Sequence, residues 1–446
     1  MQAAADDGSV SGAGRDWSRL PEDLLITVLR ALHVPDAVRS GAVCTSWHAA
    51  YAAFRRLCVP SPRQPPCLLY ACDALGSGAA ALHCPSTGAN LRIPFPLPPL
   101  ARRPLLGSGH GWLVTADDAS DLHLLNPLTG AQLALPPITA LHHVEGSTDA
   151  QGNHLYNVYE MLPEHNPSTG RLEVDEEPTV LDAHRAHEFM YDRVVLSASP
   201  SAGGGRACVV LLLHMPHGEV SFARLGDERW TWVAPGGGDT DLPWRYDYCD
   251  AMYSDADGLF YLLRFDGAMV SLDLNGPSPV ARRVLGSVPM SVNPAKYLVQ
   301  TPAGDILQVW RRREYAGSLI RVEIPPDYED DDPVENPNVV VNTTDLQLYK
   351  VDLQLQKVKR IKGLLDCALF LGLNGSLCLP VKDFPDLKPN CAYLTDDFLE
   401  YVNILKYNCR DVGVWSIAQR KMLSLVDVMY PWLNWPPPIW IKPSLF

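Results

Sequence analysis

The sequence predicts a mainly β protein with a small α-helical module near its N-terminus. Three observations lead to this fold class. Apolar residues within 16–58 recur at helical spacing, residues 67–446 hold short apolar and aromatic runs between turn-forming residues, and one segment of that region is repeated further along the chain. The proline-rich residues 59–66 lie between the two regions, and we expect a linker there because helices do not cross such a stretch.

The helical module starts with an amphipathic helix. Ser18 is placed to cap it, Pro21 lies in its first turn, and Glu22 and Asp23 stand near the positive end of the helix dipole. A second short helix is expected from Asp36. The apolar stripe of the first helix consists of Leu20, Leu24, Leu25, Val28, Leu29 and Leu32, and a third helical face consists of Val43, Cys44, Trp47, Ala50, Tyr51 and Phe54.

A module of about forty residues is at the lower limit for building its own core, so its apolar stripe needs a cover. The rest of this chain and a separate partner are both open as covers. The order of residues in this module favours a separate partner as the cover, because it resembles that of a known protein-binding module. One ordered set of residues resembles the F-box, the module by which substrate receptors dock on the Skp adaptor of cullin-RING ubiquitin ligases. The order is Leu20-Pro21, Asp23-Leu24-Leu25, Val28-Leu29, Leu32, then Asp36 and Arg39, then Val43-Cys44 and Trp47.

The resemblance implies roles for individual residues. The residues expected to bind the Skp-type adaptor are Leu20, Pro21, Leu24, Leu25, Val28 and Leu29. The residues expected to pack the helices against each other are Val43, Cys44 and Trp47. His33-Val34-Pro35 is the place where the sequence departs from a smooth helical pattern, and we expect a shifted loop there.

Composition restricts the function of the whole chain. Its 446 residues have room for one small and one large domain, and residues 1–15 are expected to be a disordered leader because they lack the pattern of a signal peptide. The net charge of −14 disfavours a nucleic-acid binder, and no apolar run is long enough to span a membrane. The 11 cysteines show no Cys-x-x-Cys pair and are expected to be reduced, buried residues of a cytoplasmic and/or nuclear protein.

An internal repeat predicts the architecture of the larger region. LHCPSTGANLRIP at 82–94 matches LLNPLTGAQLALP at 124–136, an offset of 42 residues. A period of about 40 to 45 residues in a strand-rich region is typical of a four-stranded propeller blade. In each copy a Pro-x-Thr-Gly turn joins two strands. We therefore expect a kelch/WD-like β-propeller over 67–446, with six blades favoured and seven as the alternative.

Later segments continue this pattern. Asp266-Gly267 predicts a hairpin turn, and LYKVDL at 348–353 respells MVSLDL at 269–274. The last residues hold Trp432, Trp435 and Trp440 among prolines, so they are expected to wrap a face or complete the ring instead of forming a regular central strand, with core packing favoured over a partner site. The six expected blades cover residues 67–100, 105–137, 186–235, 248–290, 296–363 and 367–428.

A second resemblance covers most of this region. The stretches 107–137 and 376–397 are similar to the β-propeller domain of the KIB-type F-box proteins of plants. Long loops are expected near 142–182 and 325–345. Within the first, residues 167–170 repeat the Pro-x-Thr-Gly turn, so a seventh blade with a long loop is the alternative there. The acidic runs of the two regions are read as solvated loops, with an acidic lip for a basic target as the alternative.

Signals for chemistry in the chain itself are weak. His184, His187 and Glu188 do not have the spacing of a metalloprotease helix, and Asp117, Asp118 and Asp121 lack the remainder of a calcium loop. No nucleophile elbow or phosphate-binding loop is present. We expect no catalytic residues, no cofactor and no metal.

The sequence therefore predicts a non-catalytic substrate-recognition adaptor of an SCF-type ubiquitin ligase. Its expected partners are a Skp-type adaptor, cullin and RING subunits reached through that adaptor, and a protein substrate, with no nucleic acid and no membrane. Two alternatives stay open. One is a propeller enzyme with a hydrolase-like site in the channel, which requires carboxylates to converge at one mouth, and the other is a Skp-binding scaffold that works without cullin.

Overall fold

The computed structural model divides the chain into two compact units, Met1–Gln64 and Pro65–Phe446. The division falls within the expected linker at 59–66. The expected leader at 1–15 and most of that linker lie outside the described residues. The structure describes residues 16–57, 64–71, 76, 78–85, 87–162, 173–174, 177–201, 208–216, 218–234, 247–290, 294–317, 339–406, 408–423, 425 and 435–445.

The first unit contains the three predicted helices after one 3-10 turn. Their order is η1 (Trp17–Arg19), α1 (Glu22–Ala31), α2 (Val34–Ser40) and α3 (Thr45–Arg56). Two of the expected helix starts are wrong. Pro21 is the N-cap of α1, while Ser18 belongs to η1, where its backbone N–H donates to Asp16. The second helix begins at Val34, because Pro35 suits the first turn of a helix, where its missing N–H costs nothing.

The core of this unit forms where α1 packs against α3. Leu25 and Leu29 of α1 are buried, as are Ala50 and Phe54 of α3, and each pair is four residues apart on one helical face. Gln64 closes the unit, since its side-chain oxygen accepts a hydrogen bond of 2.6 Å from the backbone of Val34.

The described residues of the second unit form six antiparallel-rich sheets that act as propeller blades, five with four strands and one with five. The first blade contains β1 (Cys67–Tyr70), β2 (Ala79–Cys84), β3 (Ala89–Pro94) and β30 (Ile439–Ile441). The second contains β4 (Leu105–Gly109), β5 (Trp112–Ala116), β6 (Leu122–Leu125) and β7 (Gln132–Ala134). The third contains β13 (Tyr191–Leu196), β14 (Val209–His214), β15 (Glu219–Arg224) and β16 (Thr231–Trp232). The fourth blade contains β17 (Tyr248–Ser254), β18 (Leu259–Arg264), β19 (Met269–Asp273) and β20 (Val280–Leu285). The fifth contains β21 (Ala295–Gln300), β22 (Ile306–Gly317), β23 (Val339–Asp352) and β24 (Lys357–Ile361). The sixth contains β25 (Cys367–Leu371), β26 (Leu377–Pro380), β27 (Cys391–Leu394), β28 (Gly413–Ser416) and β29 (Lys421–Leu423).

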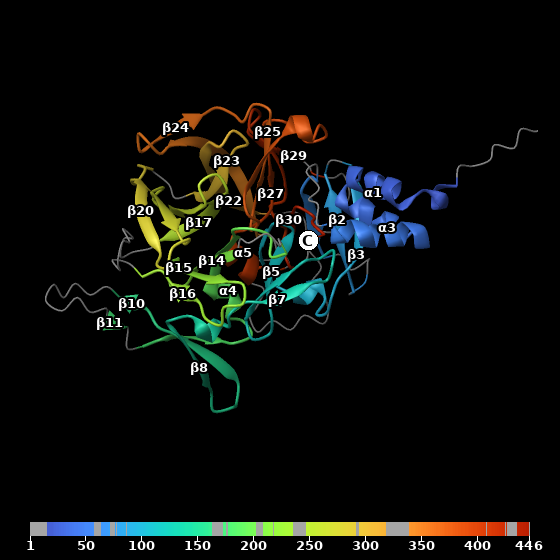
Figure 1. The fold of residues 1–446 in the computed structure, drawn as a ribbon. Helices are drawn as coiled ribbons and strands as arrows, with labels where there is room; N and C mark the ends of the chain where they lie inside the picture. The colour runs from blue at the N-terminus through green and yellow to red at the C-terminus, as the bar shows by residue number, and fades with distance from the viewer. Residues whose placement is uncertain are drawn as a thin grey trace, which may run out of the picture. The chain divides into compact units, whose positions relative to one another are not determined.

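The edge strands β30, β4, β13, β17, β21 and β26 line the centre of this unit. Contacts run in succession from β30 to β4, β13, β17, β21 and β26, and Figure 1 shows the sheets placed around a common centre. Within the described residues this gives the favoured number of six blades. The respelled turn at 167–170, which was the route to a seventh blade, lies outside them.

The internal repeat is a structural repeat. Its first copy forms the β2–β3 hairpin and its second forms β6–β7, which are the two outer strands of neighbouring blades. Gly88 and Gly130 occupy the same turn position with φ of 66° and 72°, a conformation that glycine adopts without strain. The turn chemistry of Pro-x-Thr-Gly therefore fixes both hairpins.

The C-terminal segment closes the ring. Strand β30 pairs with β1 in the register Cys67↔Ile441 and Leu69↔Ile439, so the first blade holds strands from both ends of the propeller. The expectation that this segment completes the ring is confirmed. Ile439–Ile441 form a short strand at the edge of their sheet, which agrees with the expectation that this segment forms no regular central strand. Trp440 is buried, Trp435 is half-buried, and Trp432 lies outside the described residues.

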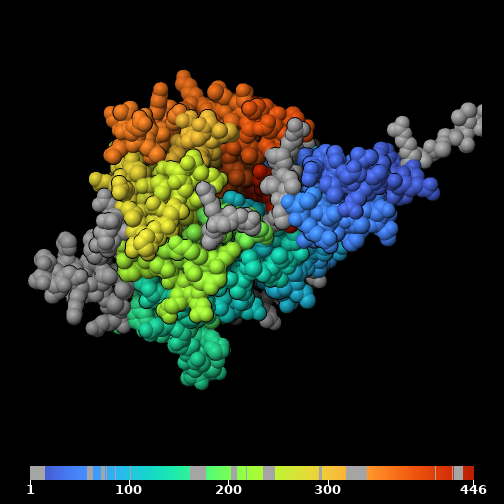
Figure 2. Space-filling model, in the orientation of Figure 1, coloured from blue at the N-terminus to red at the C-terminus, as the bar shows by residue number. Residues whose placement is uncertain are grey.

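The region 142–182 was expected to be a long loop, or a further blade that carries one, and it contains strands. It contains a three-stranded sheet of β12 (Thr179–Asp182), β9 (His154–Val158) and β8 (Val144–Thr148), and a short β10 (Met161–Leu162) to β11 (Glu173–Val174) pair. The β8–β9 hairpin extends away from the blades (Figure 1) and forms a lobe in the space-filling view (Figure 2). Residues 339–345 of the second expected loop belong to β23, while its acidic run lies outside the described residues.

In the part of the second unit that the structure describes, five short helical segments connect these strands. They are η3 (Leu100–Arg102), η4 (Ile138–Ala140), α4 (His187–Met190), η5 (Val381–Asp383) and α5 (Leu399–Ile404). Among the described residues, no helix has the length and apolar content needed to cross a membrane. The described cysteines are free thiols.

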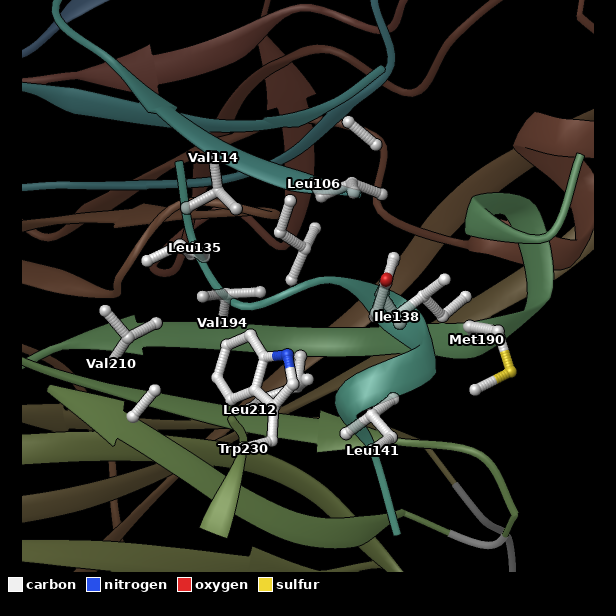
Figure 3. Packing of buried hydrophobic residues seen from close by; sticks show 14 of the residues in the cluster. Leu106, Val114, Leu135, Ile138, Leu141, Met190, Val194, Val210, Leu212 and Trp230 are labelled. Carbon is white, nitrogen blue, oxygen red and sulfur yellow. The ribbon is translucent and has the colours of Figure 1, made fainter. Parts of the chain in front are cut away.

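Apolar side chains fill the space between neighbouring blades. Figure 3 shows Trp230 beside Leu212 and Val194 of the third blade, in the same cluster as Ile138 of η4 and Val114 of β5. The indole N–H of Trp230 donates to the Pro136 carbonyl over 2.9 Å, so the buried ring satisfies its one polar group. This cluster fixes the segment after the second blade against the third.

Candidate functional site

The helical unit presents an apolar surface beside its own core. Pro21 and Leu24 are exposed, Leu24 by 49%, while Leu20 and Val28 are half-buried. Leu24 and Val28 are four residues apart, so both lie on one face of α1, next to the face that packs on α3. We call Leu20, Pro21, Leu24 and Val28 the α1 outer face.

The structure separates the six residues that were expected to bind an adaptor. Four of them form the α1 outer face. Leu25 and Leu29 are only 1% and 0% exposed, so their side chains lie in the core of the unit and support the outer face from below. Because they stand one position along the helix from Leu24 and Val28, helical rotation turns them inward.

The three residues expected to pack inside the module also differ in placement. Trp47 is half-buried, and Cys44 is half-buried at the N-cap of α3. Val43 is 70% exposed, so its predicted packing role is wrong in this structure. The physical reason is that α2 ends at Ser40, and Val43 lies in the connection before α3. Ala50 and Phe54 fill the space instead.

The second unit has a hollow of about 700 Å³ beside the central strands. Residues from β13, β17, β21 and β22 line it together with the segment 397–400. Because β13, β17 and β21 are central strands of three successive blades, the hollow lies at one mouth of the channel. Sequence reasoning identified none of its residues, since they come from strands far apart in the chain.

Arg311 of β22 organises the charged wall of this hollow. Its side chain is fully buried and donates from Nη2 to Asp411 Oδ2 over 2.7 Å, from Nε to Thr343 Oγ1 over 2.7 Å and from Nη1 to the Thr395 carbonyl over 2.7 Å. Burial alone lowers the pKa of Arg311, but the nearby Tyr297 hydroxyl and the Asp411 carboxylate outweigh burial and raise it. The guanidinium is therefore a permanent cation held by oriented acceptors.

Asp397 is the shared acceptor of the same network. Its carboxylate lies 3.3 Å from Arg311 Nη1 and 3.8 Å from Arg193 Nη2, contacts Arg313, and accepts a hydrogen bond of 3.0 Å from the Tyr297 hydroxyl. Burial raises the pKa of Asp397, but the three guanidinium groups outweigh it and hold the pKa below its usual range. The carboxylate is thus ionised and fully engaged.

Asp250 pairs with the remaining arginine. Arg193 Nε lies 2.9 Å from Asp250 Oδ1, and Arg193 Nη1 donates to the Gly372 carbonyl over 2.7 Å. Carboxylates do converge at the mouth, which is what the enzyme alternative requires. Asp250, Asp397 and Asp411 are each paired with an arginine, which is typical of a structural ion-pair network. Asp192 also lines the hollow, and burial raises its pKa to about 7 while the nearby Arg193 acts in the opposite direction.

The rim of the hollow carries exposed aromatic and charged side chains. Phe265 is 46% exposed and Tyr315 is 62% exposed, and the side chains of Arg312 and Glu314 beside Tyr315 are about half exposed. Tyr315 also packs edge-to-face against Phe398, with ring centroids 6.2 Å apart. Exposed aromatic anchors next to arginine are characteristic of protein-binding surfaces. We call Phe265, Arg312, Glu314 and Tyr315 the channel rim.

The histidine-rich segment singled out in the sequence does not gather metal ligands. Glu188 is buried between Arg185, at 3.0 Å, and Lys406, at 2.9 Å, while His187 Nδ1 lies 3.2 Å from Ser120 Oγ. His184 is exposed. These groups serve local ion pairing and hydrogen bonding where α4 meets α5.

Comparisons with known proteins agree with this organisation. The family model described as KIB1-4 beta-propeller matches residues 82–416, and the model described as F-box-like matches residues 17–59. F-box protein SKIP23 of Arabidopsis thaliana is 23% identical over 437 residues, which are 96% of this chain and 95% of the relative.

Other relatives match over shorter stretches. F-box only protein 7 of Arabidopsis thaliana is 28% identical over 123 residues, which are 28% of this chain and 30% of the relative, so the match spans about a third of that protein. A solved protein of unknown function from Bacteroides thetaiotaomicron aligns over 60% of each chain at 10% identity with a TM-score of 0.24, which is too low to inform the fold. From the two family matches, the chain belongs to the KIB1-4 β-propeller family and has the organisation of a plant F-box protein with a C-terminal propeller.

Proposed function

We propose that this chain is a non-catalytic substrate-recognition adaptor of an SCF-type ubiquitin ligase. Its F-box-like module binds a Skp-type adaptor, which links it to cullin and RING subunits, and its propeller holds a protein substrate. The chain contributes proximity, because holding a substrate beside the ubiquitin-conjugating enzyme raises the effective concentration of its lysines. Free cysteines support a reducing, cytoplasmic and/or nuclear setting.

The exposed α1 outer face carries the proposal for the adaptor contact. Pro21 and Leu24 leave apolar surface in water on a module too small to cover it. Burial of one leucine side chain contributes about 1.5 to 3 kcal/mol, so two substitutions on this face are expected to weaken binding by orders of magnitude. Leu20 and Leu24 are the side chains to remove.

The test is co-purification of the full chain with a recombinant Skp-type adaptor. The Leu20→Ala, Leu24→Ala double variant is expected to lose the adaptor. Leu57→Ala is the matched control, because Leu57 is exposed by 48%, like Leu24, but lies at the end of α3. Undiminished binding by the double variant, or equal loss in the control, contradicts the proposed face. Circular dichroism of each variant shows whether the fold is retained.

The channel rim is the proposed surface for the substrate. Phe265 and Tyr315 offer large apolar side chains that lose little conformational entropy on binding. The charged side chains of Arg312 and Glu314 select substrates by charge. Proximity labelling with the full chain, with and without proteasome inhibition, identifies bound proteins. The Phe265→Ala, Tyr315→Ala variant is expected to lose proteins that accumulate on inhibition while keeping the Skp-type adaptor. The same labelled set in both proteins removes the rim from the proposal.

Cullin recruitment separates this function from that of a scaffold. An SCF adaptor co-purifies with cullin only through the Skp-type adaptor, so the double variant of the α1 outer face is expected to lose both together. A chain that retains the Skp-type adaptor but never recovers cullin acts as a scaffold and contradicts the ligase function.

A further inference from the structure

Three ligand-forming side chains meet beside the third blade. His142 and His143 follow η4, and Glu219 begins β15. One potential ligand atom from each lies within 4.8 Å of the others, and His142 Nε2 is 3.2 Å from Glu219 Oε2. The His143 and Glu219 residues are each 3% exposed, while the His142 side chain is 17% exposed and leaves one side open to solvent.

The two histidine rings are held by aromatic stacking. His142 stacks on Trp232 with ring centroids 4.1 Å apart and planes at 14°, and His143 stacks on His214 at 5.0 Å and 11°. Leu141, immediately before them, is buried in the core that Figure 3 shows, so the backbone is anchored as well. The rings are thus positioned before any ligand binds, which lowers the entropic cost of binding.

His214 has a supporting role. Its Nδ1 lies 2.6 Å from the Met215 carbonyl and its Nε2 lies 2.9 Å from Ser221 Oγ, so both ring nitrogens are engaged. The stacked His214 ring orients the His143 ring, and its own nitrogens are not available to bind an ion. Tight placement of a ligand by its neighbours is a regular feature of metal sites.

The Nε2 atoms of the two histidines have few polar partners. Within the described part of the chain, Nε2 of His143 is buried without a hydrogen-bond partner, and Nε2 of His142 is buried with Glu219 Oε2 beside it at 3.2 Å. A buried polar atom of this kind destabilises the fold unless a partner satisfies it. A neutral imidazole ring offers a lone pair on one of its nitrogens to a metal ion.

We propose that His142, His143 and Glu219 bind one divalent transition-metal ion, with zinc as the best fit. Two imidazoles and one carboxylate form a donor set that zinc accepts, with water in the fourth position on the open side of His142. In a tetrahedral zinc site with bonds of about 2.0 to 2.1 Å, neighbouring donor atoms are about 3.3 Å apart. The 3.2 Å separation of His142 Nε2 and Glu219 Oε2 is close to this value.

The proposed ion links two parts of the fold. His142 and His143 lead directly into β8, while Glu219 belongs to the third blade. An ion at this point fixes the base of the β8–β9–β12 extension to the propeller body and is expected to stabilise the folded chain, because the unfolded chain has no preformed site. The role assigned is structural and does not depend on the proposed ligase function.

Zinc content of the purified full chain tests the proposal. The chain is stripped with a chelator, incubated with a small excess of zinc chloride, desalted and analysed by elemental mass spectrometry. One zinc per chain is expected for the unmodified protein, and at least a tenfold loss of affinity for Glu219→Gln and for His143→Gln. His154→Gln is the matched control, because His154 is an exposed histidine of the neighbouring β9 and is expected to keep the metal.

A measurement on the unmodified chain keeps the test valid if a variant fails to fold. Zinc X-ray absorption is expected to show only nitrogen and oxygen neighbours, including imidazole, and zinc is expected to raise the melting temperature. No bound zinc at micromolar concentration, sulfur in the coordination shell from the chain's cysteines, or equal zinc content in Glu219→Gln and the unmodified chain each overturns the site.

Discussion

Arg311 and Asp411 are 100 residues apart in the sequence, and a hydrogen bond of 2.7 Å joins Nη2 of the arginine to Oδ2 of the aspartate. The same carboxylate oxygen accepts from the Thr343 backbone N–H over 2.8 Å. Arg311 lies in the fifth blade and Asp411 lies just before β28 of the sixth, so the pair ties two blades together at the channel mouth. Its side chains are 0% and 5% exposed, which places the ion pair in a largely water-free environment.

Arg311→Met is expected to destabilise the propeller strongly. The substitution leaves Asp411 buried without its cation and removes one of the three guanidinium groups around Asp397, and breaking one side of a buried ion pair costs about 3 to 5 kcal/mol. Urea unfolding followed by tryptophan fluorescence measures the free energy of unfolding. Arg312→Ala is the control, because its ion pair with Glu314 is about half exposed on both sides and contributes about 0.5 kcal/mol or less. Equal effects of the two substitutions contradict a structural role for the network.

The sequence predicts what local chemistry decides. The β2–β3 and β6–β7 hairpins follow from their Pro-x-Thr-Gly turns, because the glycine conformation and the alternating side chains act within about a dozen residues. The Arg311 network could not be found in this way. Its members are polar residues in otherwise ordinary strands, and only ring closure brings them together.

The candidate site was predicted only in part for a similar reason. Helical spacing assigns Leu24 and Leu25 to one wide stripe, and only the packing of α1 on α3 shows that the first faces water and the second the core. His142 and His143 stand at the start of the long loop expected near 142–182 and were not predicted to bind a metal. Glu219 carries no local signal, so the cluster emerges only from the meeting of η4 and β15.

Leu24→Ala and Leu25→Ala are expected to act in different ways. Leu24 is 49% exposed, so its truncation is expected to weaken adaptor binding and change the free energy of unfolding by less than about 0.5 kcal/mol. Leu25 is 1% exposed, so its truncation leaves a cavity that costs about 2 to 5 kcal/mol. Binding to the Skp-type adaptor by calorimetry and thermal unfolding separate the two effects. A destabilised Leu24→Ala variant with normal binding contradicts the assignment.

His187 is expected to make stability depend on pH. Burial lowers its pKa from 6.5 to about 4, so in this range the unfolded chain binds the proton before the folded chain does. The contribution of His187 to folding is complete above about pH 6.5 and is lost as the pH falls towards 4. Urea unfolding at pH 7, 6 and 5 is expected to show a smaller acid loss for His187→Asn than for the unmodified chain.

His184→Asn provides the control for this measurement. Its side chain is exposed three residues earlier, and the variant is expected to follow the pH profile of the unmodified chain. If the free energy of unfolding of His187→Asn changes with pH in the same way as that of His184→Asn and of the unmodified chain, other groups cause the acid sensitivity.

Trp440→Ala is expected to open the closure of the propeller. Trp440 is 1% exposed on β30, and its ring lies edge-to-face against Phe370 at 5.0 Å, so one side chain packs the first blade against the sixth. Its backbone carbonyl also accepts a hydrogen bond from Ser108 Oγ in the second blade. Truncation of a buried tryptophan costs about 3 to 5 kcal/mol, and the loss falls on the strand that joins the two ends of the ring.

Hydrogen exchange is therefore expected to rise first at β1, whose partner is β30, before the other blades open. Trp17→Ala is the control, because Trp17 is 58% exposed in the helical unit and its loss leaves the exchange of β1 unchanged. Unchanged protection of β1 in Trp440→Ala means that the ring is closed by other contacts.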